Sequence, residues 1–321
     1  MNELENRLAR IEEKLSQKLD SDFTDNRDDE IDLRELWNVI WAGRIKIIAI
    51  TAVFAIASVI YALSLPNMYK SEIILAPAQS DGKSSMGALS AQYGGLAAMA
   101  GINLGGGDSS RVEQAVELIK SWPFLEELTN RYRLKPKLMA VKKWNYNTNE
   151  LIYNTDVYDS NGESWLVQGG EEPSSWETYK TFEKMLRVNY DVKKGMLSIS
   201  VTHYSPYVAH ELVNLLAFEL NKYFQSQDML KARKNIRYLE EKIIETNLTD
   251  MQSVFYNMIE SQIQTLMLAE VSEEYLVETV VPASVPEVKS KPSRALLVIL
   301  FSLIGFTIAL LTTCLFRKTK I

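Results

Sequence analysis

Cysteine is almost absent from this sequence, which contains a single one, Cys314. Residues 66–294 contain none, so disulfide bonds and cysteine-ligated metal sites are excluded from this segment. Histidine is nearly as scarce: only His203 and His210 occur, and neither has a cysteine or a paired carboxylate at the spacing of a metal site. The sequence therefore predicts no metal site, and we interpret each histidine as a surface or junction residue.

The sequence also lacks an excess of basic residues and any recognisable catalytic motif. Its net charge of −6 provides no basic surface for nucleic acid, so we expect no nucleic-acid partner. There is no Gly-x-Ser-x-Gly elbow and no His-Glu-x-x-His helix. Gly105–Gly107 lack the Lys-Ser/Thr of a phosphate-binding loop, so we interpret them as part of a surface loop. We therefore predict no enzyme activity, no catalytic residues and no cofactor.

Charged residues are missing from two long apolar runs, Ile47–Leu65 and Ala295–Phe316. A helix needs about 20 apolar residues to cross the hydrocarbon core of a bilayer, so each run is long enough to span it. Neither run has the polar stripe that a buried helix at the edge of a soluble core would show. The first run starts too far into the chain for a signal peptide. We predict two uncleaved transmembrane helices, over 45–65 and 295–316.

The flanking charges favour one orientation of these helices. Arg34, Arg44 and Lys46 precede the first run, and basic residues near a span mark its cytoplasmic side. We expect a bacterial inner-membrane protein with both termini in the cytoplasm. The expected organisation is a cytoplasmic segment over 1–44, a transmembrane helix over 45–65, a periplasmic α/β domain over 66–294, a transmembrane helix over 295–316 and a cytoplasmic tail over 317–321.

The N-terminal segment has apolar residues at heptad spacing. Leu4, Leu8, Ile11 and Leu15 are separated by four, three and four positions, as in the seam of a short coiled coil. Two heptads are marginal alone, so a frayed amphipathic helix is an equally good interpretation.

Four segments of the central region have the pattern of β-strands, and a sheet close to the bilayer is expected because the first and last flank the apolar runs. These segments are Asn67–Ala78, Met185–Val192, Met196–His203 and Glu274–Ala283. Two helices are predicted, over Arg111–Ser121, opened by a Ser-x-x-Glu box at Ser110, and over Phe124–Tyr132. Residues 138–181 are predicted to form turns and short strands. We interpret Trp144, Trp165 and Trp176 as filling a small β-core, with sugar stacking as the alternative.

A long helix is predicted over about 206–270, with a bend at Thr246–Asp250. From Pro206 to Glu245 no further proline and no glycine interrupts the helical pattern, which corresponds to about 60 Å of helix. One apolar stripe follows this helix and weakens across Gln225–Asp228. We predict it as an oligomer or packing face comprising Leu212, Leu216, Leu220, Ile236, Leu239 and Ile243.

From Asp29 onward, the sequence resembles the Wzz-type chain-length determinants, also called polysaccharide co-polymerases, in the form without a kinase domain. The stretches that carry the resemblance are DEIDLRELW, MYKSEIILAP, GGLAAMAGINLGGG, PSSWETYKTF, LSISVTHYSPYVAHELVN and VVPASVPEVKSKPSRAL. It implies an α+β membrane protein that forms a homo-oligomeric ring and sets the length of O-antigen or a similar glycan. The implied partners are a separate membrane polymerase, the bilayer and the lipid-linked glycan.

The proline-rich approach to the second apolar run is the candidate functional junction. Its residues are Pro282, Pro286, Pro292 and Arg294. We expect the junction to face the polymerase, while a stiff linker with ordinary interfacial basic residues is an equally good interpretation. Other functions that the sequence leaves open are export of capsule or exopolysaccharide, a two-span envelope sensor and, last, a periplasmic enzyme.

Overall fold

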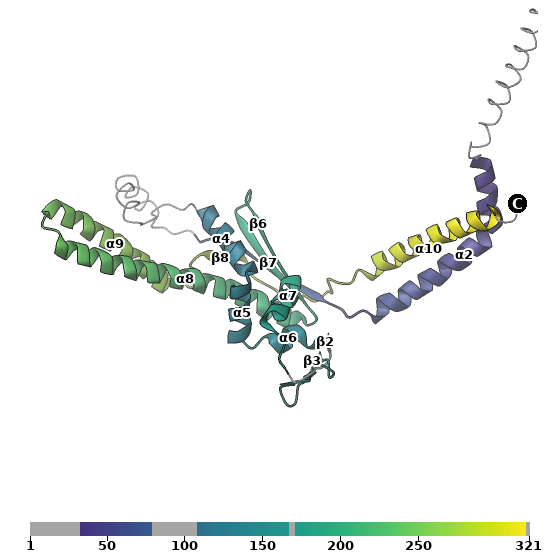
Figure 1. The fold of residues 1–321 in the computed structure, drawn as a ribbon, viewed down its shortest axis with the longest axis horizontal. Helices are drawn as coiled ribbons and strands as arrows, with labels where there is room; N and C mark the ends of the chain where they lie inside the picture. The colour runs from purple at the N-terminus through teal and green to yellow at the C-terminus, as the bar shows by residue number, and fades with distance from the viewer. Residues whose placement is uncertain (1–32, 79–107, 167–170, 319–321) are drawn as a thin grey trace, which may run out of the picture. The chain divides into compact units, whose positions relative to one another are not determined.

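The structure, a computed structural model, describes residues 33–78, 108–166 and 171–318. It divides into two compact units, Met1–Ser64 together with Ser293–Ile321, and Leu65–Pro292. The first unit contains two apolar helices, and the second is a mixed α/β domain whose elements are labelled in Figure 1. The predicted fold class, a mixed α/β domain flanked by two apolar helices, is therefore confirmed. The predicted heptad residues Leu4, Leu8, Ile11 and Leu15, and the segment Gly105–Gly107, lie outside the described residues.

The two apolar helices of the first unit pack against each other. They are α2, Leu33–Ser64, and α10, Arg294–Lys318. Their backbones approach closely at Gly305, where an added Cβ would lie only 2.6 Å from the Cβ of Phe54. Small residues permit such close packing between apolar helices. Both helices are long and apolar enough to cross a membrane, over Ile40–Ser64 and Arg294–Thr313.

The α/β domain is built on one four-stranded antiparallel sheet in the order β6-β7-β1-β8. Its strands are β1, Tyr69–Pro77; β6, Leu186–Asp191; β7, Met196–His203; and β8, Val277–Val281. The four predicted strands are thus confirmed, with ends shifted by a few residues. β6 and β7 form a hairpin whose turn contains Gly195 at a φ of +65°, a conformation that favours glycine. β1 and β8 are neighbours in the sheet although they lie far apart in sequence, so the sheet joins the first and last segments of the domain.

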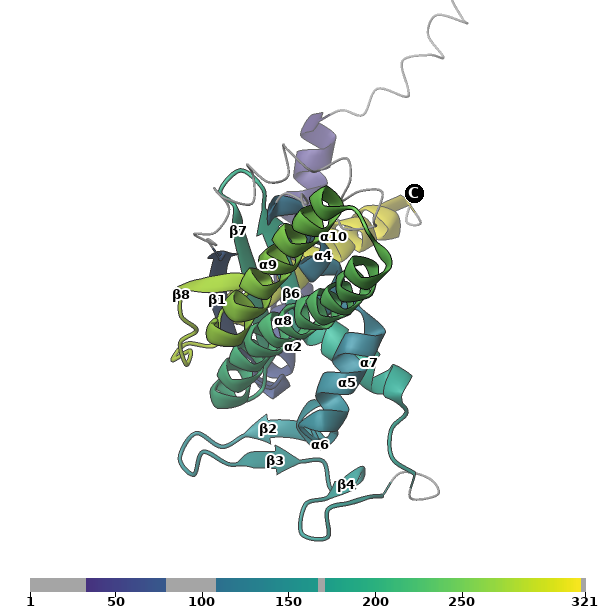
Figure 2. The same cartoon turned by 90° about the vertical axis from the view of Figure 1, so that its left-hand side faces the viewer.

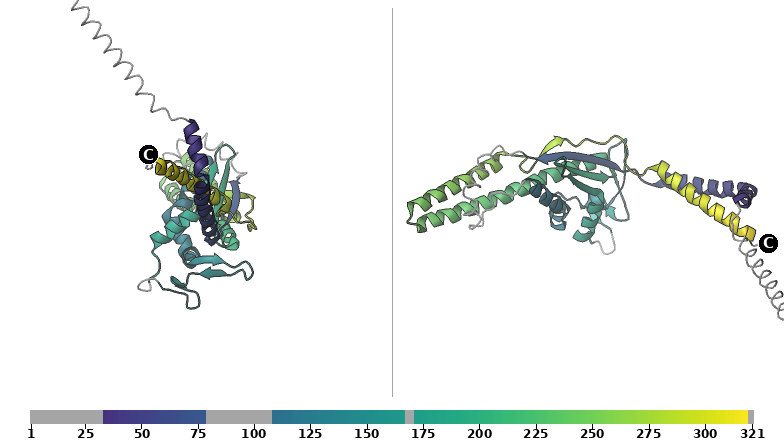
Figure 3. Two further views of the ribbon diagram at one scale, coloured as in Figure 1. Left: turned by 90° about the vertical axis from the view of Figure 1, so that its right-hand side faces the viewer. Right: turned by 90° about the horizontal axis from the view of Figure 1, so that it is seen from above.

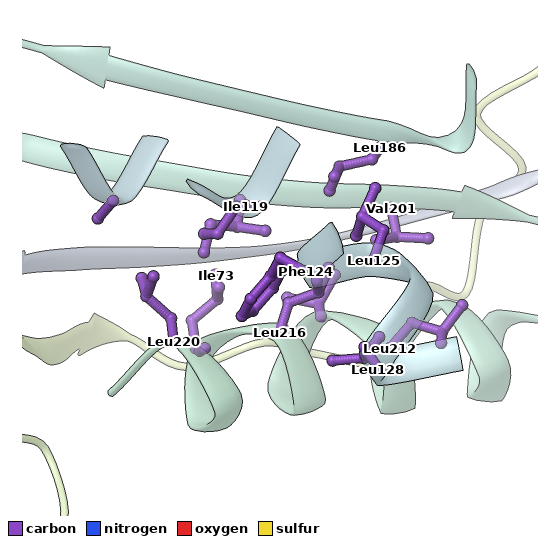
Figure 4. Packing of buried hydrophobic residues seen from close by; sticks show 14 of the residues in the cluster. Ile73, Ile119, Phe124, Leu125, Leu128, Leu186, Val201, Leu212, Leu216 and Leu220 are labelled. Atoms are coloured by element: carbon purple, nitrogen blue, oxygen red, sulfur yellow. The ribbon is translucent and has the colours of Figure 1, made fainter. Parts of the chain in front are cut away.

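One hydrophobic core lies between this sheet and the helices that cover it. The helices are α4, Asp108–Lys120; α5, Trp122–Arg131; α6, Lys135–Met139; α7, Ser175–Met185; and the first part of α8, Pro206–Glu245. Figure 4 shows Phe124 next to Leu216 of α8, with Ile119 closer to the strands. Each of these side chains is buried, and removing a leucine-sized side chain from water stabilises the fold by about 1.5–3 kcal/mol.

The ends of α4 and α5 differ from the predicted ones by one to three residues, and α7 was not predicted. Helix α4 begins at Asp108, so Ser110 lies inside the helix and is not its N-cap. Helix α7 occupies part of the segment predicted as turns and short strands. Its start is fixed by a capping box, in which the Ser174 side chain accepts from the Glu177 N–H and the Glu177 carboxylate accepts from the Ser174 N–H. The break between α4 and α5 falls at Ser121, and the predicted breaker Trp122-Pro123 instead forms the first two residues of α5.

Two small β-hairpins follow α6, which confirms the short strands predicted for this segment. They comprise β2, Val141–Trp144, with β3, Leu151–Tyr153; and β4, Tyr158–Asp159, with β5, Ser164–Trp165. Figure 2 shows β2 and β3 side by side next to α6. Trp165 packs on Tyr158 with ring centroids 5.0 Å apart, so it contributes to a small aromatic core as expected, whereas Trp176 lies on α7 and is 49% exposed, so this interpretation is wrong for Trp176.

The predicted long helix consists of two helices that form a hairpin. α8 is followed by α9, Thr249–Val271, and Figure 3 shows the pair extending together beyond the sheet. The Ser205 side chain caps the start of α8 by accepting from the N–H of Val208. The chain reverses at Thr246–Leu248, so the predicted bend is confirmed although Thr249 and Asp250 already belong to α9.

Candidate functional site

The structure places His203 in a structural position, while His210 is half-buried on α8 with its Nε2 3.1 Å from Nδ2 of Asn214. His203 is fully buried at the end of β7. It is therefore a junction residue, as one of the two interpretations predicted, and not a surface residue. Its Nε2–H donates to the Lys137 carbonyl at 2.9 Å, and its Nδ1 accepts from the Ser205 N–H at 3.0 Å. These partners require the neutral ring with the proton on Nε2, and burial lowers the pKa of His203. Among the described residues, no group of three or more potential metal ligands is found.

The pKa of His203 gives a pH-dependent stability. Because burial keeps the folded-state pKa below the ordinary value of about 6.5, the unfolded chain binds a proton that the folded chain does not. We therefore expect the free energy of unfolding to fall as pH falls below about 6.5, by at most about 1.4 kcal/mol per pH unit for this residue. Thermal unfolding at pH 7.5 and 5.5 should show a steeper loss for the parent chain than for His203→Gln. Equal losses would contradict this assignment.

A row of polar side chains on α8 holds the chain where it returns from the hairpin. The row comprises Asn221, Gln225 and Asp228, which share one helix face because they are spaced by four and three positions. Asn221 is buried, and its Nδ2 donates to the Val277 carbonyl at 2.9 Å. Its Oδ1 accepts from the N–H groups of Leu276 and Val277 at 2.8 and 2.9 Å. One side chain thus fixes the first residues of β8 against α8.

The other two members of the row extend this contact. Nε2 of Gln225 donates to the Ser272 carbonyl at 3.1 Å, at the end of α9. Asp228 accepts from the Tyr275 hydroxyl at 2.8 Å and forms an ion pair with Arg111 of α4. Burial, followed by the nearby Asp228 carboxylate, raises the pKa of Tyr275 to about 12, so the hydroxyl remains a donor at physiological pH. The base of the α8–α9 hairpin is therefore joined to α4 through Arg111 and to the segment just before β8 through Tyr275.

The segments that connect the α/β domain to the apolar helices are paired with each other. The N–H of Met68 donates to the Lys291 carbonyl at 2.9 Å, and the N–H of Ser290 donates to the Met68 carbonyl at 2.8 Å. Further along, the Ser71 hydroxyl donates to the Ser284 carbonyl at 2.8 Å. Both connections therefore leave the domain at the same place.

The predicted junction residues are distributed along the second of these segments. Pro282 follows β8 directly and is exposed, whereas Pro286 is half-buried further along. Pro292 follows a cis peptide bond, and Arg294 begins α10. The segment between β8 and α10 contains no helix or ladder strand, and it is held by the hydrogen bonds to Met68 and Ser71.

The predicted face of the long helix divides into two groups. Leu212, Leu216 and Leu220 are fully buried in the core of the α/β domain. In the second group, Leu239 is also buried, while Ile236 and Ile243 are half-buried in the part of α8 that pairs with α9. All six residues therefore make contacts within the chain.

Other apolar side chains on the α8–α9 hairpin are exposed. They include Leu230, Tyr238, Ile244, Leu248, Tyr256, Ile263, Met267 and Val271. A large exposed apolar surface on a folded protein commonly marks a site of protein–protein or membrane contact. Apart from Ile263, these residues lie outside the apolar stripes that the sequence pattern indicates for the two helices.

The architecture, a mixed α/β domain between two apolar helices that could span a membrane, defines a class of membrane-anchored proteins. Within it, residues 29–131 match the Wzz family model, described as chain length determinant protein. This match confirms, over those residues, the resemblance found in the sequence. A comparison with curated proteins finds no match.

Two solved structures are similar to this chain. One is a full-length bacterial polysaccharide co-polymerase, with 13% identity, a TM-score of 0.38 and coverage of 89% of this chain and 99% of the other. The second is a fragment of WzzB, a polysaccharide co-polymerase from Salmonella Typhimurium, with 15% identity and a TM-score of 0.31. It covers 70% of this chain and 100% of the fragment.

Proposed function

We propose that this protein regulates the chain length of a bacterial surface polysaccharide, such as O-antigen, as an oligomeric scaffold that works with a separate glycan polymerase. The observation that carries the proposal is the chain length determinant match, which spans the first apolar helix, β1, α4 and α5. The role assigned to the protein is geometric: it holds copies of itself and the polymerase in a fixed arrangement while the glycan grows.

Self-association of the chain into a ring is the first component of this proposal. The exposed leucine, isoleucine, methionine and tyrosine side chains of the α8–α9 hairpin support it. Their contact with a second copy would remove apolar surface from water, at about 25 cal/mol per Å². The junction from Pro282 to Arg294 is proposed to face the polymerase, since it directly precedes α10.

The proposed location is the bacterial inner membrane, with both apolar helices spanning it and the α/β domain in the periplasm. The two helices support this placement by length and composition, and Arg44 and Lys46 near the start of the first support a cytoplasmic N-terminus. A reporter enzyme that works only in the periplasm should be active when fused at Asn247, in the α8–α9 turn. A reporter that works only in the cytoplasm should be inactive there. Cytoplasmic activity at this position would contradict the proposed topology.

Deletion of the gene tests the function. We expect the glycan ladder of the deletion strain on a gel to lose its preferred length and to regain it when the cloned chain is supplied. A ladder of unchanged distribution would reject the proposal. If the strain instead makes less exported capsule or exopolysaccharide while its O-antigen ladder is unaltered, the export function considered from the sequence replaces chain-length control.

A further inference from the structure

Four aromatic rings gather at the end of the α/β domain where β1 begins. We call this group, Tyr69, Trp144, Tyr146 and Tyr207, the Trp144 cluster. The Trp144 ring lies 5.5 Å from Tyr69, 5.7 Å from Tyr146 and 6.1 Å from Tyr207, measured between ring centroids. Nε1 of Trp144 donates to Oδ1 of Asn149 at 2.9 Å, which fixes the indole on the loop between β2 and β3.

The Trp144 cluster is open to its surroundings. Tyr146 is 80% exposed and Tyr207 is 50% exposed, while Tyr69 and Trp144 are half-buried. Lys142 and Lys143 precede Trp144 in β2, and both are exposed. One exposed carboxylate, Glu150, lies on the same hairpin. The surface therefore combines amphipathic rings with a small excess of positive charge.

The chain itself limits how far the cluster can lie from the first apolar helix. Helix α2 ends at Ser64 and β1 begins at Tyr69. These five steps along the chain reach at most about 18 Å when fully extended. The second connection leaves at the same place, because Lys291 is paired with Met68, the neighbour of Tyr69.

We propose that the Trp144 cluster and the two adjacent lysines form a membrane-contact surface that rests in the phospholipid headgroup layer. This inference depends on the proposed bilayer position of the apolar helices. Tryptophan and tyrosine are enriched at that depth because their rings combine an apolar body with a polar edge. Lysines near the membrane are attracted to anionic lipid headgroups. Contact with phospholipid headgroups explains three features together: the exposed rings, the two lysines and the short connection between α2 and β1.

The surface would serve to fix the tilt of the α/β domain on the bilayer. The two connections leave from one place, so alone they provide a single point of attachment. A second contact, made by the β2–β3 hairpin to the side of this point, would restrict rotation of the domain about it. Such a contact would help to hold the α8–α9 hairpin at a reproducible angle.

Spin labels on the full chain test the contact. In a Cys314→Ser background, Asn147→Cys places a label on the β2–β3 loop without removing a ring of the cluster. Asn247→Cys, an exposed asparagine in the α8–α9 turn, is the matched control. Ile56→Cys, on an exposed position of α2, reports the hydrocarbon core. Each protein is reconstituted in nanodiscs of phosphatidylethanolamine and phosphatidylglycerol at three to one, and accessibility to oxygen and to a water-soluble nickel chelate is compared.

We expect the oxygen-to-nickel accessibility ratio at Asn147→Cys to be several-fold higher than at Asn247→Cys and lower than at Ile56→Cys. The ratio at Asn147→Cys should fall when Trp144→Ala is added. It should also fall in a chain that carries Lys142→Gln and Lys143→Gln when phosphatidylcholine replaces both lipids of the nanodisc. A water-like ratio at Asn147→Cys, with a hydrocarbon-like ratio at Ile56→Cys, would overturn the membrane contact while leaving the proposed function intact. Shielding from both reagents at Asn147→Cys would also overturn it, since it indicates contact with another protein copy.

Discussion

Replacement of Leu216 by alanine is expected to destabilise the α/β domain by about 3 kcal/mol. Leu216 is 0% exposed and lies in the core between α8, α4, α5 and the sheet (Figure 4). A buried leucine-to-alanine change costs about 2–5 kcal/mol, because it removes apolar contacts and leaves a cavity. For a domain of this size, the expected shift is a thermal midpoint lower by roughly 6–12 °C. Circular dichroism of the detergent-solubilised full chain measures it.

Leu230→Ala is the matched control for this experiment. The residue lies on the same helix, but it is 60% exposed, so the identical change should alter the free energy of unfolding by less than about 1 kcal/mol. Because Leu230 belongs to the exposed apolar set of the hairpin, its replacement is expected to weaken self-association instead. Equal midpoints for Leu216→Ala and the parent chain would contradict the core assignment.

Replacement of Asn221 by alanine is expected to have an effect of similar size by a different mechanism. The change removes the Oδ1 that accepts from the N–H groups of Leu276 and Val277, and it also removes the Nδ2–H that donates to the Val277 carbonyl. Buried backbone groups that lose their partners cost about 1–3 kcal/mol each. We expect a total loss of about 3 kcal/mol, and faster amide hydrogen exchange at the start of β8.

Ser226→Ala provides the comparison for Asn221→Ala. Its side chain is exposed on the same helix and donates only to the carbonyl of Tyr223, one turn earlier. The free energy of unfolding should therefore change by less than about 0.5 kcal/mol. If Asn221→Ala leaves the exchange of Leu276 and Val277 unaltered, the polar row does not hold the returning strand.

The sequence predicted the elements whose patterns are local and uninterrupted. Alternation in Met196–His203 predicted a strand, and the absence of further proline or glycine after Pro206 predicted the long helix. The two apolar helices were predicted from length and missing charge alone. In each case, the residues that decide the element lie within it, so distant contacts were not needed.

The missed features depend on contacts between distant segments. Asn221 appears in the sequence as one polar residue near a helical apolar stripe, and its partners lie more than fifty residues away. The weakening of the stripe across Gln225–Asp228 coincides with two members of the polar row, but it does not include Asn221 and does not indicate what these side chains bind. Helix α7 was missed because its capping box at Ser174 is short and follows a segment rich in turn-forming residues.

The polar row on α8 makes the length of the hairpin independent of the rest of the domain. Asn221, Gln225 and Asp228 fix where the outgoing helix leaves and where the returning chain rejoins the sheet. Equal numbers of turns could therefore be added to, or removed from, α8 beyond Asp228 and α9 before Ala269. Each added turn would extend the reach of the domain by about 5.4 Å, without disturbing the sheet or its core.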